Sequence, residues 1–204
     1  LRVTQNVTGT ARLRVNPTGR VAGVILGADF APDLDFGTSE GIIYATDLSK
    51  NRTPAQTIHK LTGKVSGQNG ITVLGGPLVW GYDWIMPAQD ALGLMNINND
   101  FSGPITVVGG ALKVVFDAEN DGSFTQGALG NLDNPIYLDG GYFVRDQDAD
   151  GPGAKNAVLA PSRTLYLGTQ GGWLHGVSTI RARITGPGGL FQCVEGAGRH
   201  VITN

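Results

Sequence analysis

The chain has 204 residues, of which 16% are charged and 32 are glycine, and its formal net charge is −2 at pH 7. The small net charge argues against a nucleic-acid-binding protein, and no apolar run approaches the eighteen residues or so that a transmembrane helix needs. Low charge with much glycine is typical of a β-rich protein, and no break in composition marks a linker, so we expect one domain over residues 1–204.

The first sixteen residues alternate between apolar and polar side chains, which is the period of a half-buried strand. Because sixteen extended residues would span roughly 50 Å, more than a usual strand, we divide the segment at Gly9 into an arm, residues 1–8, and a strand, residues 10–15. Leu1, Val3 and Val7 share the apolar side of the arm. The arm either lies on its own domain or adds a strand to a neighbouring subunit.

The next segments read as short strands separated by turns. Residues 16–19 predict a turn that would join the strand 10–15 to a strand 20–26 as a hairpin, and residues 28–39 have the composition of a loop. Only residues 86–95 have a mildly helical pattern, with Pro87 suited to a first turn. Further strands are expected at 41–46, 56–61, 71–74 and 78–85.

The second half of the chain continues in the same way. Many short strands at close spacing predict a β-sandwich, which we expect to resemble a jelly roll with long loops and at most one short helix. A parallel β-helix is the rival, but the sequence lacks the short fixed repeat that favours that fold. The expected strands are 105–108, 111–116, 123–125, 135–138, 141–145, 157–159, 164–167, 177–184, 190–194 and 200–203.

Two acidic segments suggest a metal site. Each places carboxylates at alternate positions before a glycine, like the first half of an EF-hand calcium loop. The closing glutamate of such a loop is missing, since position twelve is Ala128 in one segment and Ala157 in the other. Calcium would therefore need further ligands, and the alternative is a pair of polar turns. The candidate ligands are Asp117, Glu119, Asp121, Asp146, Asp148 and Asp150.

Three aromatic residues alternate on the predicted strand 78–85. Trp80, Tyr82 and Trp84 would share one face of that strand. An exposed row of rings offers a platform for sugars, whereas an inward row would belong to the core or to a subunit interface.

The charges are unevenly distributed. Residues 1–28 contain Arg2, Arg12, Arg14 and Arg20 but no acid, while residues 83–150 contain eleven acids and two basic residues. This asymmetry favours head-to-tail contact between identical subunits, unless the two regions meet within one subunit or the acids form a solvated face.

Catalytic patterns are lacking. His59, His175 and His200 show no paired spacing, the nucleophile pattern Gly-x-Ser-x-Gly does not occur, and Cys193 is the single cysteine. We therefore expect a protein that is not an enzyme.

These observations together predict a structural subunit of an extracellular filament or surface assembly, joined by the N-terminal arm and stabilised by calcium. One alternative is a secreted carbohydrate-binding domain of adhesin or lectin type, with a glycan as its partner. Another is a viral capsid or tail protein, which would place the chain in a virion. Because the sequence begins at Leu1, we expect a secretory signal to have been removed.

Overall fold

The computed structural model describes residues 1–16, 18–45, 58–75, 91–114, 127–145, 157–175, 178–193 and 201–202. Within these ranges the regular secondary structure consists of short β-strands, and no helix occurs. The strands are β1 (Arg2–Val3), β2 (Arg12–Arg14), β3 (Val21–Leu26), β4 (Asp33–Asp35), β5 (Glu40–Ala45), β6 (Ile58–Leu61), β7 (Val65–Ser66), β8 (Ile71–Leu74), β9 (Ala91–Leu94), β10 (Ile105–Val108), β11 (Ala111–Val114), β12 (Ile136–Asp139), β13 (Gly141–Arg145), β14 (Ala157–Leu159), β15 (Thr164–Leu167), β16 (Gly172–His175), β17 (Ser178–Ile180), β18 (Arg183–Thr185), β19 (Leu190–Cys193) and β20 (Val201–Ile202).

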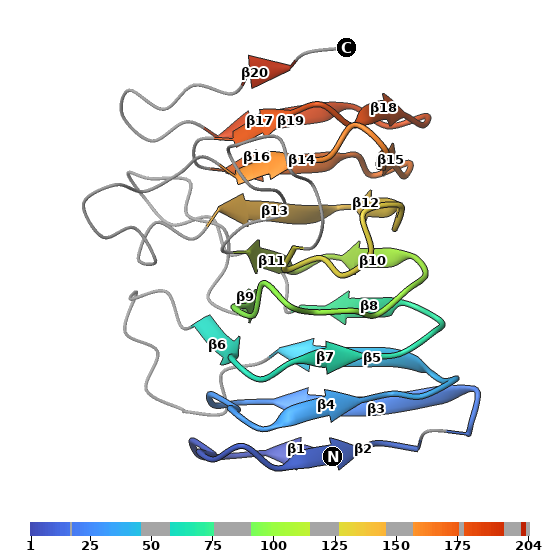
Figure 1. Ribbon diagram of the computed structural model, residues 1–204. Coiled ribbons are helices and arrows are strands. Elements are labelled where there is room, and N and C mark those ends of the chain that lie inside the picture. The colour runs from blue at the N-terminus through green and yellow to red at the C-terminus, as the bar shows by residue number, and fades with distance from the viewer. Residues whose placement is uncertain are drawn as a thin grey trace, which may run out of the picture.

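The strands form parallel sheets, and within each sheet the strands of successive turns lie side by side. The largest has eight strands in the order β1-β3-β5-β8-β10-β12-β15-β18, and the second has six in the order β19-β16-β13-β11-β9-β6. All pairings between the named strands of the described chain are parallel. The chain therefore winds upward from its N-terminus, and each turn lies on the one before it (Figure 1). This arrangement is a parallel β-helix.

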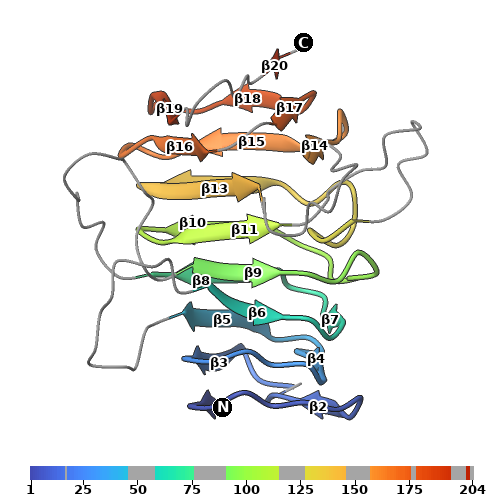
Figure 2. The same cartoon turned by 90° about the vertical axis from the view of Figure 1, so that its left-hand side faces the viewer.

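The winding has three sides. Figure 2 faces the six-stranded sheet, whose stack is continued into the first turns by bridges from Val7 to Phe30 and from Phe30 to Leu61. The third side carries β2-β4-β7 near the N-terminus and β14-β17-β20 near the C-terminus. Between these two small sheets, the amide of Ser102 donates to the carbonyl of Gly67, and that of Asn131 to the carbonyl of Phe101. The third side is thus joined by main-chain hydrogen bonds from turn to turn.

The predicted antiparallel β-sandwich of jelly-roll type is therefore wrong, although the strand-rich character of the chain is confirmed. Alternation shows which side chains point inward, but parallel and antiparallel partners impose the same period of two. The turns of the helix also differ in length: Ile25 lies opposite Tyr44, 19 residues later, while Leu74 lies opposite Val108, 34 residues later. Segments inserted between strands remove the fixed period that would have indicated a β-helix.

The core is a column of apolar side chains inside the winding. In β3, Ala22, Val24 and Leu26 are buried, while the residues between them are exposed. Successive turns repeat this pattern, so Ile71, Ile105 and Ile136 lie in register and are all fully buried. Stacking like side chains in this way covers the apolar face that each turn could not bury alone.

Buried polar side chains form hydrogen bonds between the corners of successive turns. Asn99 accepts a hydrogen bond from the amide of Val65 at 2.8 Å and donates to the carbonyl of Ala128 at 2.7 Å. Arg163, 1% exposed, donates to the carbonyls of Asn131 and Asn134 at 2.8 and 2.9 Å. These bonds satisfy main-chain groups that the corners would otherwise leave buried without partners.

One corner also requires glycine. Gly70 has a φ of +76°, and a Cβ there would lie 2.1 Å from the carbonyl oxygen of Pro104 in the next turn. Any larger residue would therefore push two turns apart.

Three local predictions are corrected. The expected hairpin of residues 10–26 does not form, because β2 pairs with β4, and β3 pairs with β1 and β5. The expected loop 28–39 contains β4, and the part of the helical segment 86–95 that the structure describes contains β9. Each segment adopts a β conformation because strands of neighbouring turns lie beside it, a contact that local sequence does not reveal.

Candidate interaction surface

The outer face of the eight-stranded sheet is the candidate interaction surface. Pairing in register aligns its outward residues into rows that run across the strands. The residues of the central row are, from β3 to β18, Gly23, Ile42, Thr72, Thr106, Tyr137, Tyr166 and Thr185. The row contains no charged residue, so the centre of this face is neutral.

Large apolar and aromatic side chains stand exposed on this surface. Tyr137 and Tyr166 are each 37% exposed, and their ring centroids lie 5.3 Å apart at an angle of 46°. On the neighbouring row, Ile25, Tyr44 and Val108 are between 37% and 39% exposed. Several exposed apolar side chains on neighbouring strands of one face favour contact with another molecule, whereas single exposed apolar residues are common.

Charged residues lie only toward the margins of this sheet. Within its strands these are Arg2, Glu40, Asp139 and Arg183. A carboxylate oxygen of Glu40 accepts a hydrogen bond from the Thr72 hydroxyl at 2.5 Å, and Asp139 accepts one from the amide of Gln170 at 2.9 Å. In the described part of the chain, the Arg183 side chain forms no ion pair.

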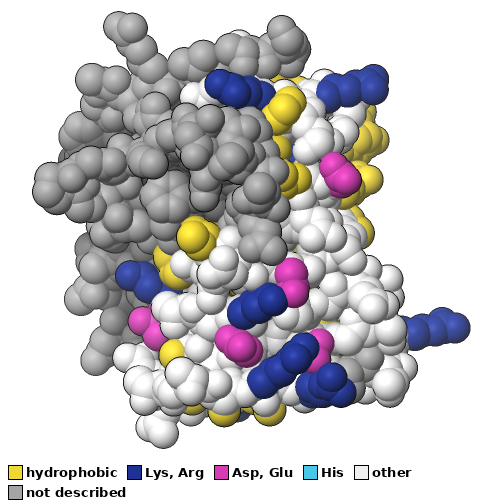
Figure 3. Space-filling model, in the orientation of Figure 1, with side chains coloured by type: hydrophobic (Ala, Val, Ile, Leu, Met, Phe, Trp, Pro, Cys, Tyr) yellow, Lys and Arg dark blue, Asp and Glu magenta, His cyan; other side chains and the backbone are white. Residues whose placement is uncertain are grey.

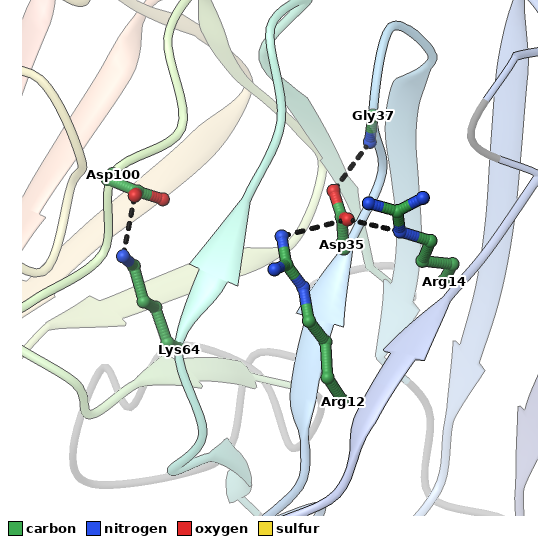
Figure 4. Close-up of polar contacts among 6 residues, drawn as sticks. All are labelled: Arg12, Arg14, Asp35, Gly37, Lys64 and Asp100. Atoms are coloured by element: carbon green, nitrogen blue, oxygen red, sulfur yellow. Dashed lines mark hydrogen bonds and ion pairs between the residues drawn. The ribbon is translucent and has the colours of Figure 1, made fainter.

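The third side of the helix differs sharply, because it carries alternating charges near the N-terminus (Figure 3). The Asp35 carboxylate accepts hydrogen bonds from Arg12 and Arg14, each at 2.9 Å, and from the amide of Gly37 at 2.9 Å (Figure 4). The Asp35 side chain is 7% exposed, whereas those of the two arginines are more than half exposed. Burial raises the pKa of Asp35, but the Gly37 amide and the two arginines outweigh it, so the pKa lies below its ordinary value.

A second ion pair continues this side. Lys64 and Asp100 are 2.5 Å apart, and both side chains are partly exposed. Burial raises the pKa of Asp100, but hydrogen bonds from Lys64 and Ser66 outweigh it, so the net shift is downward. In each ion pair a basic and an acidic side chain from neighbouring turns neutralise each other's charge. This indicates that the pairs stabilise the contact between turns.

The N-terminal basic region is thus partly neutralised within its own chain. The charge asymmetry of the sequence pointed to acids in residues 83–150 as the complement, but Arg12 and Arg14 pair with Asp35. Asp35 lies outside residues 83–150, so these two ion pairs decide neither for head-to-tail contact nor for its alternatives.

The predicted arm forms the beginning of the first turn of the helix. The Leu1 amino group donates to the carbonyl of Gly23 at 3.0 Å, and the carbonyls of Leu1 and Val3 accept from Ile25 and Gly27. Val3 is 3% exposed, Val7 packs against the core, and Leu1 is 44% exposed. These three residues lie on their own domain in this structure.

The other predicted site residues lie outside the described ranges. These are the six carboxylates proposed for calcium, together with Trp80, Tyr82 and Trp84. The strands that precede the two acidic segments are hydrogen-bonded neighbours, with Val114 of β11 opposite Arg145 of β13. The last described residues before the two acidic segments are therefore neighbours on one sheet. Among the residues that the structure does describe, no three His, Cys, Asp or Glu residues gather as a metal site.

A separate aromatic column lies on the six-stranded sheet. Tyr142, Trp173 and Phe191 come from β13, β16 and β19 and lie opposite one another in register. Their ring centroids are 5.3 and 4.6 Å apart, and both pairs are stacked. Exposure increases along the column, from 2% for Tyr142 to 45% for Phe191.

The sequence did not single out the outer face of the eight-stranded sheet. One signal was present: four strands carry Thr or Tyr between two buried apolar residues, as in Ile71-Thr72-Val73 and Ile136-Tyr137-Leu138. The same pattern occurs at Ile105-Thr106-Val107 and Leu165-Tyr166-Leu167. The triplets are a weak signal of stacked strands, because the successive intervals from Thr72 to Thr106, Tyr137 and Tyr166 are 34, 31 and 29 residues and form no fixed period.

Comparisons with protein-family models, with curated proteins and with solved structures found no match for this chain. In the described residues no helix is long and apolar enough to cross a membrane.

Proposed function

We propose that this chain is a structural subunit that assembles with copies of itself through the outer face of its eight-stranded sheet. The observation that supports this most directly is the row of neutral and aromatic side chains across the face, with Tyr137 and Tyr166 exposed at its centre. Full burial of a large apolar side chain contributes about 1.5 to 3 kcal/mol, and covering the exposed 37% of each ring supplies a part of that, so the contact needs several such residues together.

The contact proposed here replaces donation of the N-terminal arm. Residues 1–7 use main-chain groups in pairing with residues 23–31 of the same chain. Donating the arm to a neighbour would require breaking those bonds and exposing Val3, which is 3% exposed. The outer face needs no such rearrangement, because its side chains already stand clear of the sheet.

The test is the association state of the wild-type protein and of a variant with Tyr137→Lys and Tyr166→Lys. Both side chains point outward, so the variant should fold, but the added charges would remain unpaired in a contact between copies. We expect the wild-type protein to sediment as an oligomer and the variant as a monomer.

The matched control is Ile97→Lys, which adds a charge at a position that is 46% exposed but lies away from this sheet. It should leave the association unchanged. A wild-type protein that is monomeric at every attainable concentration would contradict the proposed function.

Location and ligands remain predictions. An extracellular, cell-surface or virion setting suits a strand-rich structural protein, and calcium would add rigidity if it bound to the acidic segments. Carbohydrate binding by Trp80, Tyr82 and Trp84 likewise stays a prediction, because these residues lie outside the described ranges.

A further inference from the structure

We propose that two copies pack with their helix axes antiparallel, related by a two-fold axis that runs along the strand direction between β10 and β12. This inference rests on the proposed function and specifies its contact. The charges and side-chain sizes on the outer face of the eight-stranded sheet support it.

The register of the sheet determines which residues would meet. Neighbouring strands are about 4.8 Å apart, so the rows of outward residues are evenly spaced along the helix axis. A two-fold axis between β10 and β12 brings β10 opposite β12 of the second copy, β8 opposite β15, and β5 opposite β18. Residues of one row then face residues of the same row.

Two of the four charged residues of the sheet, Glu40 and Arg183, become complementary in this arrangement. Glu40 of β5 and Arg183 of β18 are the first residues of their strands and lie in the same row. In that row Glu40 pairs with Val21 of β3, and Arg183 pairs with Thr164 of β15. Rotation therefore places Glu40 of each copy opposite Arg183 of the other, which forms two ion pairs per dimer. The Thr72 hydroxyl holds one oxygen of Glu40 at 2.5 Å and thereby orients the carboxylate.

The sizes of the central row are also complementary. The half of the row on β8 and β10 carries Thr72 and Thr106, and the half on β12 and β15 carries Tyr137 and Tyr166. The proposed axis puts Thr72 opposite Tyr166 and Thr106 opposite Tyr137. Each large ring thus faces a small side chain, which allows the two sheets to interdigitate.

The other two-fold arrangement lacks both features. An axis parallel to the helix axis would put each strand opposite its own copy, so Tyr137 would meet Tyr137 and Tyr166 would meet Tyr166. Glu40 would then face the row that contains Tyr44 rather than an arginine. The antiparallel arrangement is therefore favoured on charge and on volume.

Charge reversal tests the arrangement in the full chain. Glu40→Arg and Arg183→Glu should each replace two attractive pairs by two repulsive ones and weaken the dimer by about tenfold or more. The double variant restores opposite charges and should associate within roughly threefold of wild type. Dissociation constants from sedimentation, with circular dichroism to confirm folding, measure these effects.

Arg2→Glu is the matched control. It makes the same change of charge on the same sheet, but β1 lies beyond the overlap of the two copies and the dimer should keep its affinity. If the double variant is no tighter than the single variants, the proposed register is wrong. If the wild-type protein associates and the two Tyr→Lys changes abolish association while the charge variants have no effect, the register is wrong and the proposed function stands.

Cysteine cross-linking gives an independent measurement that does not depend on charge. Because facing sheets pack about 10 Å apart, beyond the reach of a disulfide, a short bifunctional maleimide serves as the cross-linker. In a Cys193→Ser background, it should join a mixture of Thr106→Cys and Tyr137→Cys proteins into mixed dimers. Cross-links formed preferentially within each variant alone would contradict the antiparallel arrangement, because they require equivalent strands to meet.

Discussion

At the scale of single residues, Asp35 shows how one carboxylate joins two turns. It is nearly buried and receives hydrogen bonds from two arginines of β2 and from the Gly37 amide. Because these groups lower its pKa in the folded chain, the stability that it contributes is complete above the ordinary aspartate pKa of about 3.9. That contribution is lost as the pH falls through the lowered folded-state value.

We therefore expect Asp35→Asn to reduce the free energy of unfolding by about 1 to 2 kcal/mol at pH 7, since it removes charge-assisted hydrogen bonds whose arginine partners are well solvated. The difference from wild type should shrink as the pH is lowered to about 3, below the ordinary aspartate pKa. Urea denaturation at both pH values measures it, with Asp133→Asn, an exposed aspartate on a turn, as the control. An equal difference at both pH values would show that the charge of Asp35 is not what matters.

At the scale of elements, the aromatic column on the six-stranded sheet links β13, β16 and β19. Trp173 stacks on Tyr142 on one side and on Phe191 on the other, so it contacts both neighbouring turns. In a solenoid each turn is stabilised mainly by its neighbours. Loss of the central ring should therefore loosen the C-terminal turns before the rest of the chain.

Trp173→Ala should lower the free energy of unfolding by about 2 to 4 kcal/mol, because it removes a large ring and two stacked contacts. Hydrogen exchange should increase most in β19. Ile97→Ala, which shortens a 46% exposed side chain on a turn outside both sheets, serves as the control and should cost under about 1 kcal/mol. Uniform loss of protection in all strands would contradict this local role of the column.

At the scale of the whole molecule, the two acidic segments follow β11 and β13 in the sequence, and these two strands are paired in the six-stranded sheet. If calcium binds to their carboxylates, a hundredfold excess over the dissociation constant would stabilise the folded chain by about 2.7 kcal/mol. We then expect the midpoint of thermal unfolding to rise by about 5 to 10 °C relative to protein in chelator.

Scanning calorimetry with calcium, with magnesium and with chelator measures this shift. Asp117→Asn and Asp148→Asn each change one segment, and each should reduce the calcium-dependent rise if both segments supply ligands. Identical unfolding midpoints with calcium and with chelator would show that calcium does not stabilise this protein. The acidic segments would then be interpreted as polar turns.

The sequence by itself determined where many strands lie and which side chains point inward. Residues 71–74, 105–108, 141–145, 157–159 and 164–167 were predicted with the bounds that the structure has. These features are local, since they depend on alternation along a few residues and on glycine or polar turns between them.

Only the tertiary structure decided which strands are partners. Tyr137 and Tyr166 meet because β12 and β15 belong to successive turns, and Arg12 reaches Asp35 because β2 lies beside β4. The intervals between partners vary with the segments inserted at the corners, so no fixed period in the sequence reveals them. The fold and its neutral face therefore follow from contacts between turns, which local patterns cannot specify.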